Sequence, residues 1–404
     1  MKKFLTIVAS ATMLAGVLLA APSTASAGTT KYDYFVAHNA SSYHAGLGIS
    51  CKAADYDNLQ DALDAAGDSD KIYVCAGNWK PSDDGQDSYY VDTDVEIIGA
   101  GATRTYIDGG CSGFSTMYVY ESYVTVRNIT FRNGCSTGDS YSDGGAIYAD
   151  NSAINCYASV FANNTASDIG GAISAVSVYS DGCTFTGNSA FSEESPWGGG
   201  AIAAMGIYAG KSTFTNNHGA GAGGAVATVC GFMIWNSKFS QNSSDSDGGA
   251  LYSEYASGAP CVNVDVRNST FTGNVAGADG NSYAVGGAIA FEWGTALVSG
   301  GAFKNNLAMC AGGAIAGVKD TAVNASRTIF SGNSTRGDCD SPSSWGWPTS
   351  VPVGGDAILA GAVHLDRANF QGNYGSGTAV WAWCNLDEVK VRYGAGQESY
   401  SWDC

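Results

Sequence analysis

The chain has 404 residues, 55 of them glycine, and a formal net charge of −18 at pH 7. An acidic surface repels nucleic acid and anionic lipid, so we expect neither as a partner. Only 14% of the residues are charged. Low charge beside abundant glycine favours a β-rich protein outside the cell.

Residues 1–27 are predicted to be a secretory signal peptide. Lys2 and Lys3 precede an apolar stretch over residues 4–20, and the small residues 25–27 form a cleavage site. The alternative is a membrane anchor, but the stretch is short and a cleavage signal follows it. No later apolar run is long enough to cross a bilayer. We therefore expect a secreted or surface-associated extracellular chain whose mature part has no transmembrane segment.

Residues 28–88 are expected to cap the rest of the chain. Residues 57–66 predict an amphipathic helix that opens at Asp57, places Leu59 and Leu63 on one face, and ends before Gly67. A strand over residues 71–75 follows it. A repeat array needs its apolar end closed, and a helix packed on that end does so.

From residue 89 the chain consists of short apolar runs, grouped in threes and separated by turn residues. Two motifs return along it: Gly-Gly-Ala followed by Ile, Val or Leu, and Phe-x-x-Asn. The first begins at Gly144, Gly170, Gly199, Gly223, Gly248, Gly286 and Gly312. The second supplies the pairs Phe161/Asn164, Phe185/Asn188, Phe214/Asn217, Phe239/Asn242, Phe271/Asn274, Phe303/Asn306, Phe330/Asn333 and Phe370/Asn373. Repetition with a period in the twenties predicts a solenoid whose units touch only their neighbours.

We predict one all-β domain over residues 28–404, a right-handed three-sided parallel β-helix with a helical N-terminal cap. Its coils occupy residues 89–393 and number about eleven. Each motif phenylalanine is expected to point inward and stack on the next. Each motif asparagine is expected to take the positive φ of a sharp corner and to form a ladder with the asparagine amides above and below. The Gly-Gly pair forms another corner with positive φ.

The 12 cysteines are an even number in an exported chain, which favours disulfides. Because only adjacent turns of a solenoid touch, pairing between sequence neighbours is expected, and the last pair closes a tail over residues 384–404. For Cys156 and Cys183 a free, buried stack is the alternative. The predicted pairs are Cys51–Cys75, Cys111–Cys135, Cys156–Cys183, Cys230–Cys261, Cys310–Cys339 and Cys384–Cys404.

Loops of variable length separate each motif asparagine from the next Gly-Gly pair. Insertions at one position of a repeat emerge along one edge of a solenoid, and we expect binding there. Arg336, Gly337 and Asp338 form an Arg-Gly-Asp tripeptide of the kind that integrins read; an ordinary turn is the alternative. Other candidates are sugar-stacking aromatics and loop acids: Trp197, Trp345, Trp347, Glu193, Glu194, Asp139, Asp143, Asp245, Asp247 and Asp340.

No cofactor or metal site is predicted, although Ca²⁺ could bind acidic loops. The four histidines, His38, His44, His218 and His364, share no metal-ligand spacing. They are interpreted as incidental.

The alternation of Gly-Gly-Ala-[Ile/Val/Leu] with Phe-x-x-Asn resembles the repeats of the chlamydial polymorphic outer-membrane proteins. The helical cap resembles that of bacterial secreted right-handed β-helix repeat proteins. The resemblance spans roughly residues 57–393, and its motifs are specific for the fold. It implies a surface adhesin delivered as an autotransporter passenger.

We therefore interpret the chain as an adhesin-like protein that contacts a cell-surface protein or a polysaccharide through its loop edge. The alternative is a polysaccharide lyase or glycoside hydrolase of the pectate-lyase-like β-helix type, with paired acids for general acid and base work. The Asn-Thr-Asp, Gly-His-Gly and Arg-Ile-Lys motifs of polygalacturonases do not occur in the sequence, so binding is favoured over catalysis.

Overall fold

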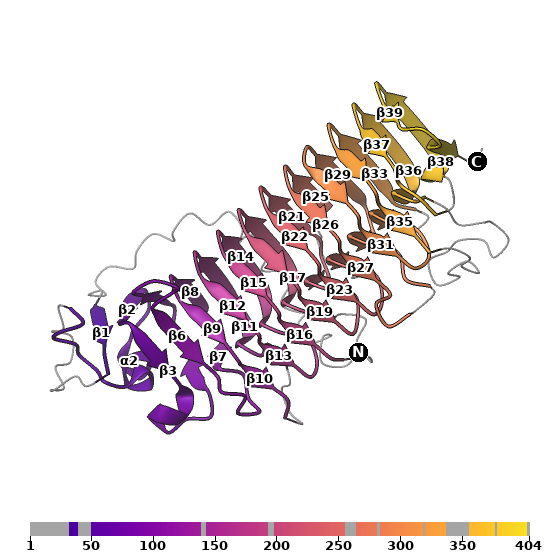
Figure 1. The fold of residues 1–404 in the computed structure, drawn as a ribbon. Coiled ribbons are helices and arrows are strands. Elements are labelled where there is room, and N and C mark those ends of the chain that lie inside the picture. Colours follow the sequence, from indigo (N-terminus) through magenta and orange to yellow (C-terminus); the bar gives the residue numbers. More distant parts are fainter. Residues whose placement is uncertain are drawn as a thin grey trace.

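A computed structural model describes residues 32–38, 50–138, 143–192, 198–254, 264–280, 283–317, 320–336, 355–375 and 378–401. The chain winds into a rod of parallel strands that stack turn upon turn (Figure 1). It is an all-β parallel solenoid with three sheets, as the repeats predict. The signal peptide predicted over residues 1–27 lies outside the described residues.

The N-terminal end is closed by a small cap. Helix α2 (Leu59–Ala65) is capped by Asn58, whose side chain accepts a hydrogen bond from the backbone N–H of Asp61. Asn58, rather than the predicted Asp57, therefore begins the helix. Leu59 and Leu63 are buried against the first turns. The 3₁₀ helix η2 (Pro81–Asp84) adjoins α2, and the Asp84 carboxylate accepts from the N–H of Leu59.

The long sheet has twenty strands and forms one wall of the rod. Its strands are β1 (Asp33–Val36), β2 (Asp70–Val74), β4 (Tyr89–Val91), β5 (Val95–Gly99), β7 (Met117–Tyr120), β8 (Tyr123–Arg127), β11 (Ile147–Tyr157), β14 (Ile173–Asp181), β17 (Ile202–Gly210), β20 (Val226–Thr228), β21 (Phe232–Trp235), β24 (Leu251–Ser253), β25 (Val264–Arg267), β28 (Ile289–Phe291), β29 (Thr295–Ser299), β32 (Ile315–Gly317), β33 (Ala322–Ser326), β36 (Ile358–Asp366), β38 (Thr378–Val389) and β40 (Glu398–Ser401).

The phenylalanine sheet has twelve strands and carries the motif phenylalanines. Its strands are β3 (Gly77–Trp79), β6 (Thr105–Asp108), β9 (Thr130–Arg132), β12 (Val160–Ala162), β15 (Thr184–Thr186), β18 (Thr213–Thr215), β22 (Lys238–Ser240), β26 (Thr270–Thr272), β30 (Ala302–Lys304), β34 (Ile329–Ser331), β37 (Asn369–Gln371) and β39 (Arg392–Tyr393).

The short sheet consists of eight two-residue strands that follow the motif corners. These are β10 (Cys135–Ser136), β13 (Thr165–Ala166), β16 (Ser189–Ala190), β19 (His218–Gly219), β23 (Ser243–Ser244), β27 (Val275–Ala276), β31 (Leu307–Ala308) and β35 (Ser334–Thr335).

The three walls of each turn differ from those read from the sequence. The first two apolar runs of a repeat were expected on separate sheets, but both lie in the long sheet and merge into one strand in β17. We call them its first and second stretches. The third wall is the short sheet, whose two-residue strands are too brief to give an alternating pattern. This sheet extends only from β10 to β35. The turns number about nine rather than the expected eleven.

The motif phenylalanines form one continuous stack inside the rod. From Phe131 to Phe370 the ring centroids of successive turns lie 4.6–5.2 Å apart with the rings nearly parallel. Tyr393 continues the stack at 5.1 Å. All the motif phenylalanines are fully buried. The spacing follows the distance between neighbouring strands, about 4.8 Å, which places like rings above one another.

The eight motif asparagines form the expected ladder, and all of them are buried. Each side-chain N–H donates to the amide oxygen of the next asparagine, at 2.8–3.0 Å. Gly134 donates to the first rung and Gln397 accepts from the last. The rungs, in chain order, are Asn164, Asn188, Asn217, Asn242, Asn274, Asn306, Asn333 and Asn373.

The backbone conformation predicted for these asparagines is wrong. The positive φ that was expected at each rung belongs instead to the residue before it, for example Asn163 at 55°. The ladder asparagine must turn inward, and the preceding residue absorbs the sharp bend. The bend thus lies at Asn163, Gly187, Asn216, Gln241, Gly273, Asn305, Gly332 and Gly372, and not at Asn164, Asn188, Asn217, Asn242, Asn274, Asn306, Asn333 and Asn373.

The two glycines of the Gly-Gly motif serve different purposes. Gly248, the first of its pair, has φ 65° and provides the predicted corner. At Gly249, the second, a Cβ atom would collide with the backbone of Gly287 and Val275 in the next turn. The motif therefore encodes one turn conformation and one close approach between coils.

Three disulfides join neighbouring turns: Cys51–Cys75, Cys111–Cys135 and Cys156–Cys183. They match three of the predicted pairs, including the one for which a free stack was the alternative. Cys230, Cys310 and Cys384 are also disulfide-bonded, and their predicted partners Cys261, Cys339 and Cys404 lie outside the described residues.

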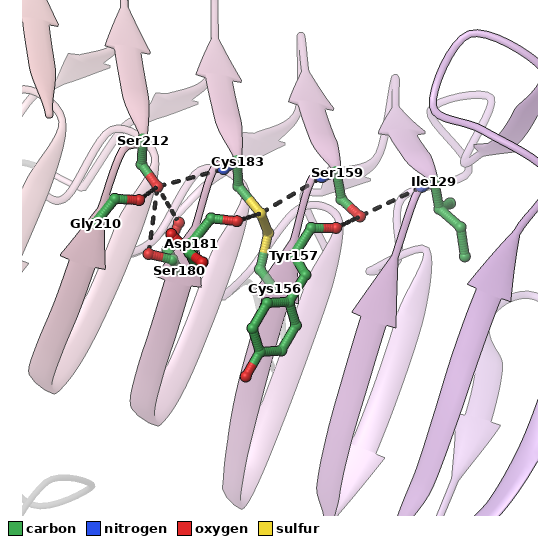
Figure 2. The surroundings of a disulfide bond; sticks show 9 residues. All are labelled: Ile129, Cys156, Tyr157, Ser159, Ser180, Asp181, Cys183, Gly210 and Ser212. Carbon is green, nitrogen blue, oxygen red and sulfur yellow. Dashed lines mark hydrogen bonds between the residues drawn. A yellow bond between two sulfur atoms is a disulfide. The ribbon is translucent and has the colours of Figure 1, made fainter. Parts of the chain in front are cut away.

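Cys183 occupies a position in a second ladder, made of serines at the corner before the phenylalanine sheet. Ser159 accepts from the N–H of Ile129, the Cys183 sulfur from that of Ser159, and Ser212 from that of Cys183 (Figure 2). One turn later, a hydrogen bond of 2.8 Å between Ser180 and Ser212 takes the place of the disulfide. A disulfide and a hydrogen bond between two serines thus join equivalent positions on successive turns.

Insertions leave the rod at two corners. Those between an asparagine and the next Gly-Gly pair follow the short sheet, as after β16 and β27, so they share one edge as predicted. A second set, not predicted, separates the two stretches of the long sheet. Its longest member joins β24 to β25. Both corners tolerate extra residues because the strands on either side keep their register.

Candidate functional site

Most of the binding residues predicted from the sequence lie outside the described part of the chain. These are Gly337, Asp338, Trp345, Trp347, Trp197, Glu193 and Glu194, together with the candidate acids Asp139 and Asp340. Arg336 is described: its side chain is exposed, and its backbone N–H donates to the carbonyl of Ala308 at 3.2 Å.

The described loop acids have structural contacts. Asp245 lies 3.5 Å from the His218 ring, and Asp247 accepts from the backbone N–H of Val285 at 2.8 Å. The carbonyl of Asp143 accepts from the Ser115 hydroxyl. Asp245 and Asp247 each contact another part of the chain, and their candidate role as a pair of acids stays a prediction.

The ladder asparagines are structural residues and do not reach a binding surface. Asn188, Asn306 and Asn333 are fully buried, like their neighbours in the row. Each also donates to the backbone carbonyl of a motif phenylalanine on the preceding turn: Asn188 to Phe161, Asn306 to Phe271 and Asn333 to Phe303. Their amides are therefore occupied within the rod.

One outer surface of the rod is covered by its own loops. The outward residues of the first stretch follow one register row through Tyr252, Ala290, Ala316 and Leu359. All four are buried, in a cluster with loop residues such as Cys310. This part of the long sheet is therefore closed in the middle of the rod.

The second stretch of the long sheet carries an exposed aromatic platform. Tyr179, Tyr208 and Met233 stand in register on successive turns. Tyr157 and Trp235 lie in the next row, which passes through Asp181 and Gly210. The Tyr157 and Tyr179 ring centroids are 5.6 Å apart, and those of Tyr179 and Trp235 are 6.3 Å apart. These side chains are all partly exposed. Burial raises the pKa of the Tyr179 and Tyr208 phenols, so both remain neutral hydrogen-bonding groups.

A glycine supports the indole of Trp235. Gly210 is the register partner of Trp235 on the preceding turn, and a Cβ atom there would overlap the indole ring. The indole therefore lies across the neighbouring strand, in the space that a larger residue would fill. A ring held in this way presents a broad aromatic surface beside Tyr179.

A shallow groove of about 400 Å³ continues the platform toward the C-terminus. Its first residues, Asp265 and Arg267, are one register step from Met233 and Trp235. The same two rows then supply the rest of the lining: Leu297, Ser299, Asn324, Ser326, His364 and Asp366. Val298 and Ala325 complete it from the strand interiors. Platform and groove thus form one track across the turns, which we call the open face.

The charges at the groove are paired. Arg267 donates two hydrogen bonds to the buried carboxylate of Asp265, and these raise the Arg267 pKa. His364 lies 2.8 Å from Asp387. The hydrogen bonds that Arg367 donates to Asp366 lower the pKa of that carboxyl. Among the described residues of the groove, each basic side chain already has a carboxylate partner.

Two glutamates stand beside each other at the corner between the two stretches. Glu254 follows Ser253 and Glu292 follows Phe291, and those residues are register partners on adjacent turns. The Tyr252 hydroxyl donates to Glu292 at 2.7 Å. Burial, and then the charge of Glu292, raises the pKa of Glu254 to about 7. One of its carboxylate oxygens is buried and has no hydrogen-bond partner among the residues that the structure describes.

A row of tyrosines marks the N-terminal turns. Tyr90, Tyr118 and Tyr148 are register partners, with ring centroids 5.8 and 5.4 Å apart. They face outward from the first stretch, upstream of the covered region. This row is separate from the open face.

Three segments match the Chlamydia polymorphic membrane protein (Chlamydia_PMP) repeat family: residues 158–176, 182–205 and 236–254. Each begins at the corner before a motif phenylalanine and runs through the ladder asparagine into the first stretch of the long sheet. The chain is a polymorphic-membrane-protein-like β-helix repeat protein. No curated protein matches it.

The matched segments stop short of the open face. They omit Tyr157, Tyr179, Tyr208, Met233 and Trp235, which all fall in the gaps between or just before the matches. The polymorphic-membrane-protein-like repeat thus describes the corners, the stack and the ladder. The platform and groove are features of this chain's own outward residues.

Sequence reasoning missed the open face. His364 was interpreted as incidental, and Asp265, Arg267 and Glu254 were not considered. Residues of the groove are separated by about one turn or more in the sequence, and only the register brings them together. The signal available was positional: counting from each motif phenylalanine back to the second stretch would have aligned these residues in rows.

Neither a metal site nor a membrane-spanning helix is found in the part of the chain that the structure describes. No group of three or more His, Cys, Asp or Glu side chains there could hold a metal ion. Within the same residues, no helix is long and apolar enough to cross a bilayer.

Proposed function

We propose that this protein is a secreted or surface-associated, adhesin-like binding protein that contacts a protein or glycan partner. The polymorphic-membrane-protein-like repeats fit a surface protein, and the disulfides are compatible with an oxidising environment outside the cell. The observation that carries the proposal is the open face, where aromatic surface and polar groups lie side by side on a rigid sheet. Rigid elements position binding groups without a large entropic cost.

The loop edge is proposed as a second contact region. Arg336 lies at its described border with an exposed side chain, and the Arg-Gly-Asp tripeptide begins with it. If this region contributes, Arg336→Ala weakens adhesion to integrin-bearing cells and leaves ligand binding at the open face unchanged.

The function is tested with purified residues 28–404 on panels of extracellular-matrix proteins, whole cells and polysaccharides. Saturable binding is expected, with no release of reducing ends or unsaturated products. Adding a chelator should leave binding unchanged, and a loss would assign Ca²⁺ a part in it. Absence of binding to every member of the panels would overturn the proposal.

A second candidate is a polysaccharide lyase or glycoside hydrolase, favoured by Glu254 and Glu292. A carboxyl group whose pKa is raised to about 7 beside a second carboxylate is suited to general acid and base work. Depolymerisation of any polysaccharide by the purified protein, lost in both Glu254→Gln and Glu292→Gln, would establish this candidate in place of binding alone.

A further inference from the structure

The open face has a linear form that follows the axis of the rod. Its two rows cross the turns from β14 through β36, with one outward residue of each row on each turn. Neighbouring turns are about 4.8 Å apart, comparable with the length of one sugar residue. A straight polymer with a short repeat would meet a new pair of side chains at each turn.

The chemistry changes along this track from stacking to hydrogen bonding. At the N-terminal end Tyr179, Tyr208 and the Gly210-supported Trp235 offer flat rings. At the C-terminal end Asn324, Ser326 and His364 offer donors and acceptors around the side chain of Leu297. Pyranose rings can make both kinds of contact, because their C–H bonds pack on aromatic rings and their hydroxyls form hydrogen bonds with polar groups.

The charge of the track selects among glycans. Arg267 and His364 already contact Asp265 and Asp387, and Arg367 contacts Asp366. The whole chain carries a net charge of −18. A polyuronate or sulfated glycan would meet arginines that are already paired with carboxylates, within an acidic field, and its binding would be opposed. A neutral glycan meets no such barrier, and the paired charges act for it as fixed hydrogen-bonding groups.

We propose that the open face binds a neutral polysaccharide chain extended along the rod axis, stacked on Tyr179 and Trp235 and hydrogen-bonded in the groove lined by Asp265, Asn324 and His364. This assignment rests on the proposed binding function and names its ligand class. It excludes polyuronates of the pectin type as ligands of this face.

The test measures affinity by titration calorimetry and by quenching of tryptophan fluorescence. The probes are hexasaccharides of neutral β-glucan, mannan, xylan and chitin, with oligogalacturonate as the anionic comparison. We expect at least one neutral hexasaccharide to bind and oligogalacturonate not to bind. Affinity for the neutral ligand should be insensitive to added NaCl, since no net ion pairing drives it.

Single substitutions test whether the ligand binds at the open face. Trp235→Ala is expected to weaken binding roughly tenfold or more, the loss associated with one stacked ring. Gly210→Ser should weaken it similarly, although residue 210 lies beneath the indole, because a side chain there displaces the ring. Tyr90→Ala removes an exposed tyrosine of the separate N-terminal row and should leave affinity unchanged. Circular dichroism establishes that each variant retains its fold.

The outcomes separate this assignment from the proposed function. Binding to protein partners without binding to any neutral glycan overturns the glycan assignment and leaves the binding function intact. Glycan binding that survives both Trp235→Ala and Gly210→Ser overturns the location. Binding of oligogalacturonate in preference to the neutral probes overturns the charge argument. Failure to bind any protein, cell or glycan overturns both proposals.

Discussion

The ladder corner and the open face belong to the same turns but follow opposite rules. At the corner an asparagine returns on eight turns, and every rung is bonded to the next. On the open face one register row reads Tyr179, Tyr208, Met233, Asp265, Leu297, Asn324 and His364. The type of an inward residue is constrained because it must pack against the turns on both sides of it. An outward residue also contacts solvent, so its type can vary. The repeat therefore specifies a scaffold, and function is carried by the residues that do not repeat.

The largest effect is expected from breaking one rung of the ladder. Asn242 donates to Phe214 and Asn274 and accepts twice from Asn217. Asn242→Ala removes these four hydrogen bonds and leaves the buried backbone N–H of Asn217 without its acceptor. At about 0.5–1.5 kcal/mol for each bond and about 1–3 kcal/mol for the unpaired group, several kcal/mol of unfolding free energy should be lost. Asn324→Ala, on the open face, should change it by less than about 0.5 kcal/mol. Chemical denaturation measures both, and equal losses would contradict the contrast.

A smaller loss is expected where two turns approach closely. Gly249→Ala places a methyl group against the backbone of the next turn and should cost about 3 kcal/mol. The matched control is Gly182→Ala: Gly182 has φ 70° but open space around it, so only the conformational cost of about 1–2 kcal/mol applies. Thermal unfolding compares the two. Equal destabilisation of the two variants would contradict the larger cost expected from contact between turns.

Removing two different disulfides should cost different amounts of stability. Removing Cys111–Cys135 by the double change Cys111→Ser and Cys135→Ser should cost about 3 kcal/mol for its 24-residue separation. For Cys156→Ala with Cys183→Ser the loss should be smaller, because a hydroxyl at position 183 continues the serine ladder between Ser159 and Ser212. Denaturation midpoints under oxidising conditions test the order of the two losses, and the reverse order would contradict it.

The smallest effect concerns Glu254 and pH. Because the pKa of its carboxyl is raised from 4.5 to about 7, the folded state holds a proton that the unfolded state releases between these values. Stability from this group is complete below about pH 4.5 and is lost as pH rises through 7. Glu254→Gln should therefore stabilise the protein at pH 8 by about 1 kcal/mol, after discounting for partial exposure, and have little effect at pH 4. A pH-independent difference would contradict the assignment.

The features predicted correctly from the sequence are those in which one residue type serves one inward position. Phenylalanine, asparagine and glycine repeat at fixed spacing, so the stack, the ladder and the close corners could be read directly. The positive φ was placed one residue late because the bend and the ladder share adjacent positions. The joining of two apolar runs in β17 was missed because Gly206 between them reads as a turn residue, although the strand continues through it.

The open face could not be read in this way because insertions vary the interval between turns. Asp265 and Leu297 are register partners, as are Asn324 and His364, yet their separations along the chain differ. No local motif marks such a row, and none of its members from Met233 onward shares a residue type with the next. Once the register is known, the members of the row can be identified directly.

The asparagine ladder also has a direction. Every amide gives a hydrogen toward its C-terminal neighbour, so the row starts at an N–H of Gly134 and ends at Gln397, which accepts from Asn373 and also donates back to its carbonyl. A whole turn duplicated anywhere inside the row would find the same donor before it and the same acceptor after it. A turn added beyond Gln397 would not. Such a protein can lengthen from within, and each internal duplication would extend its outer track by one step.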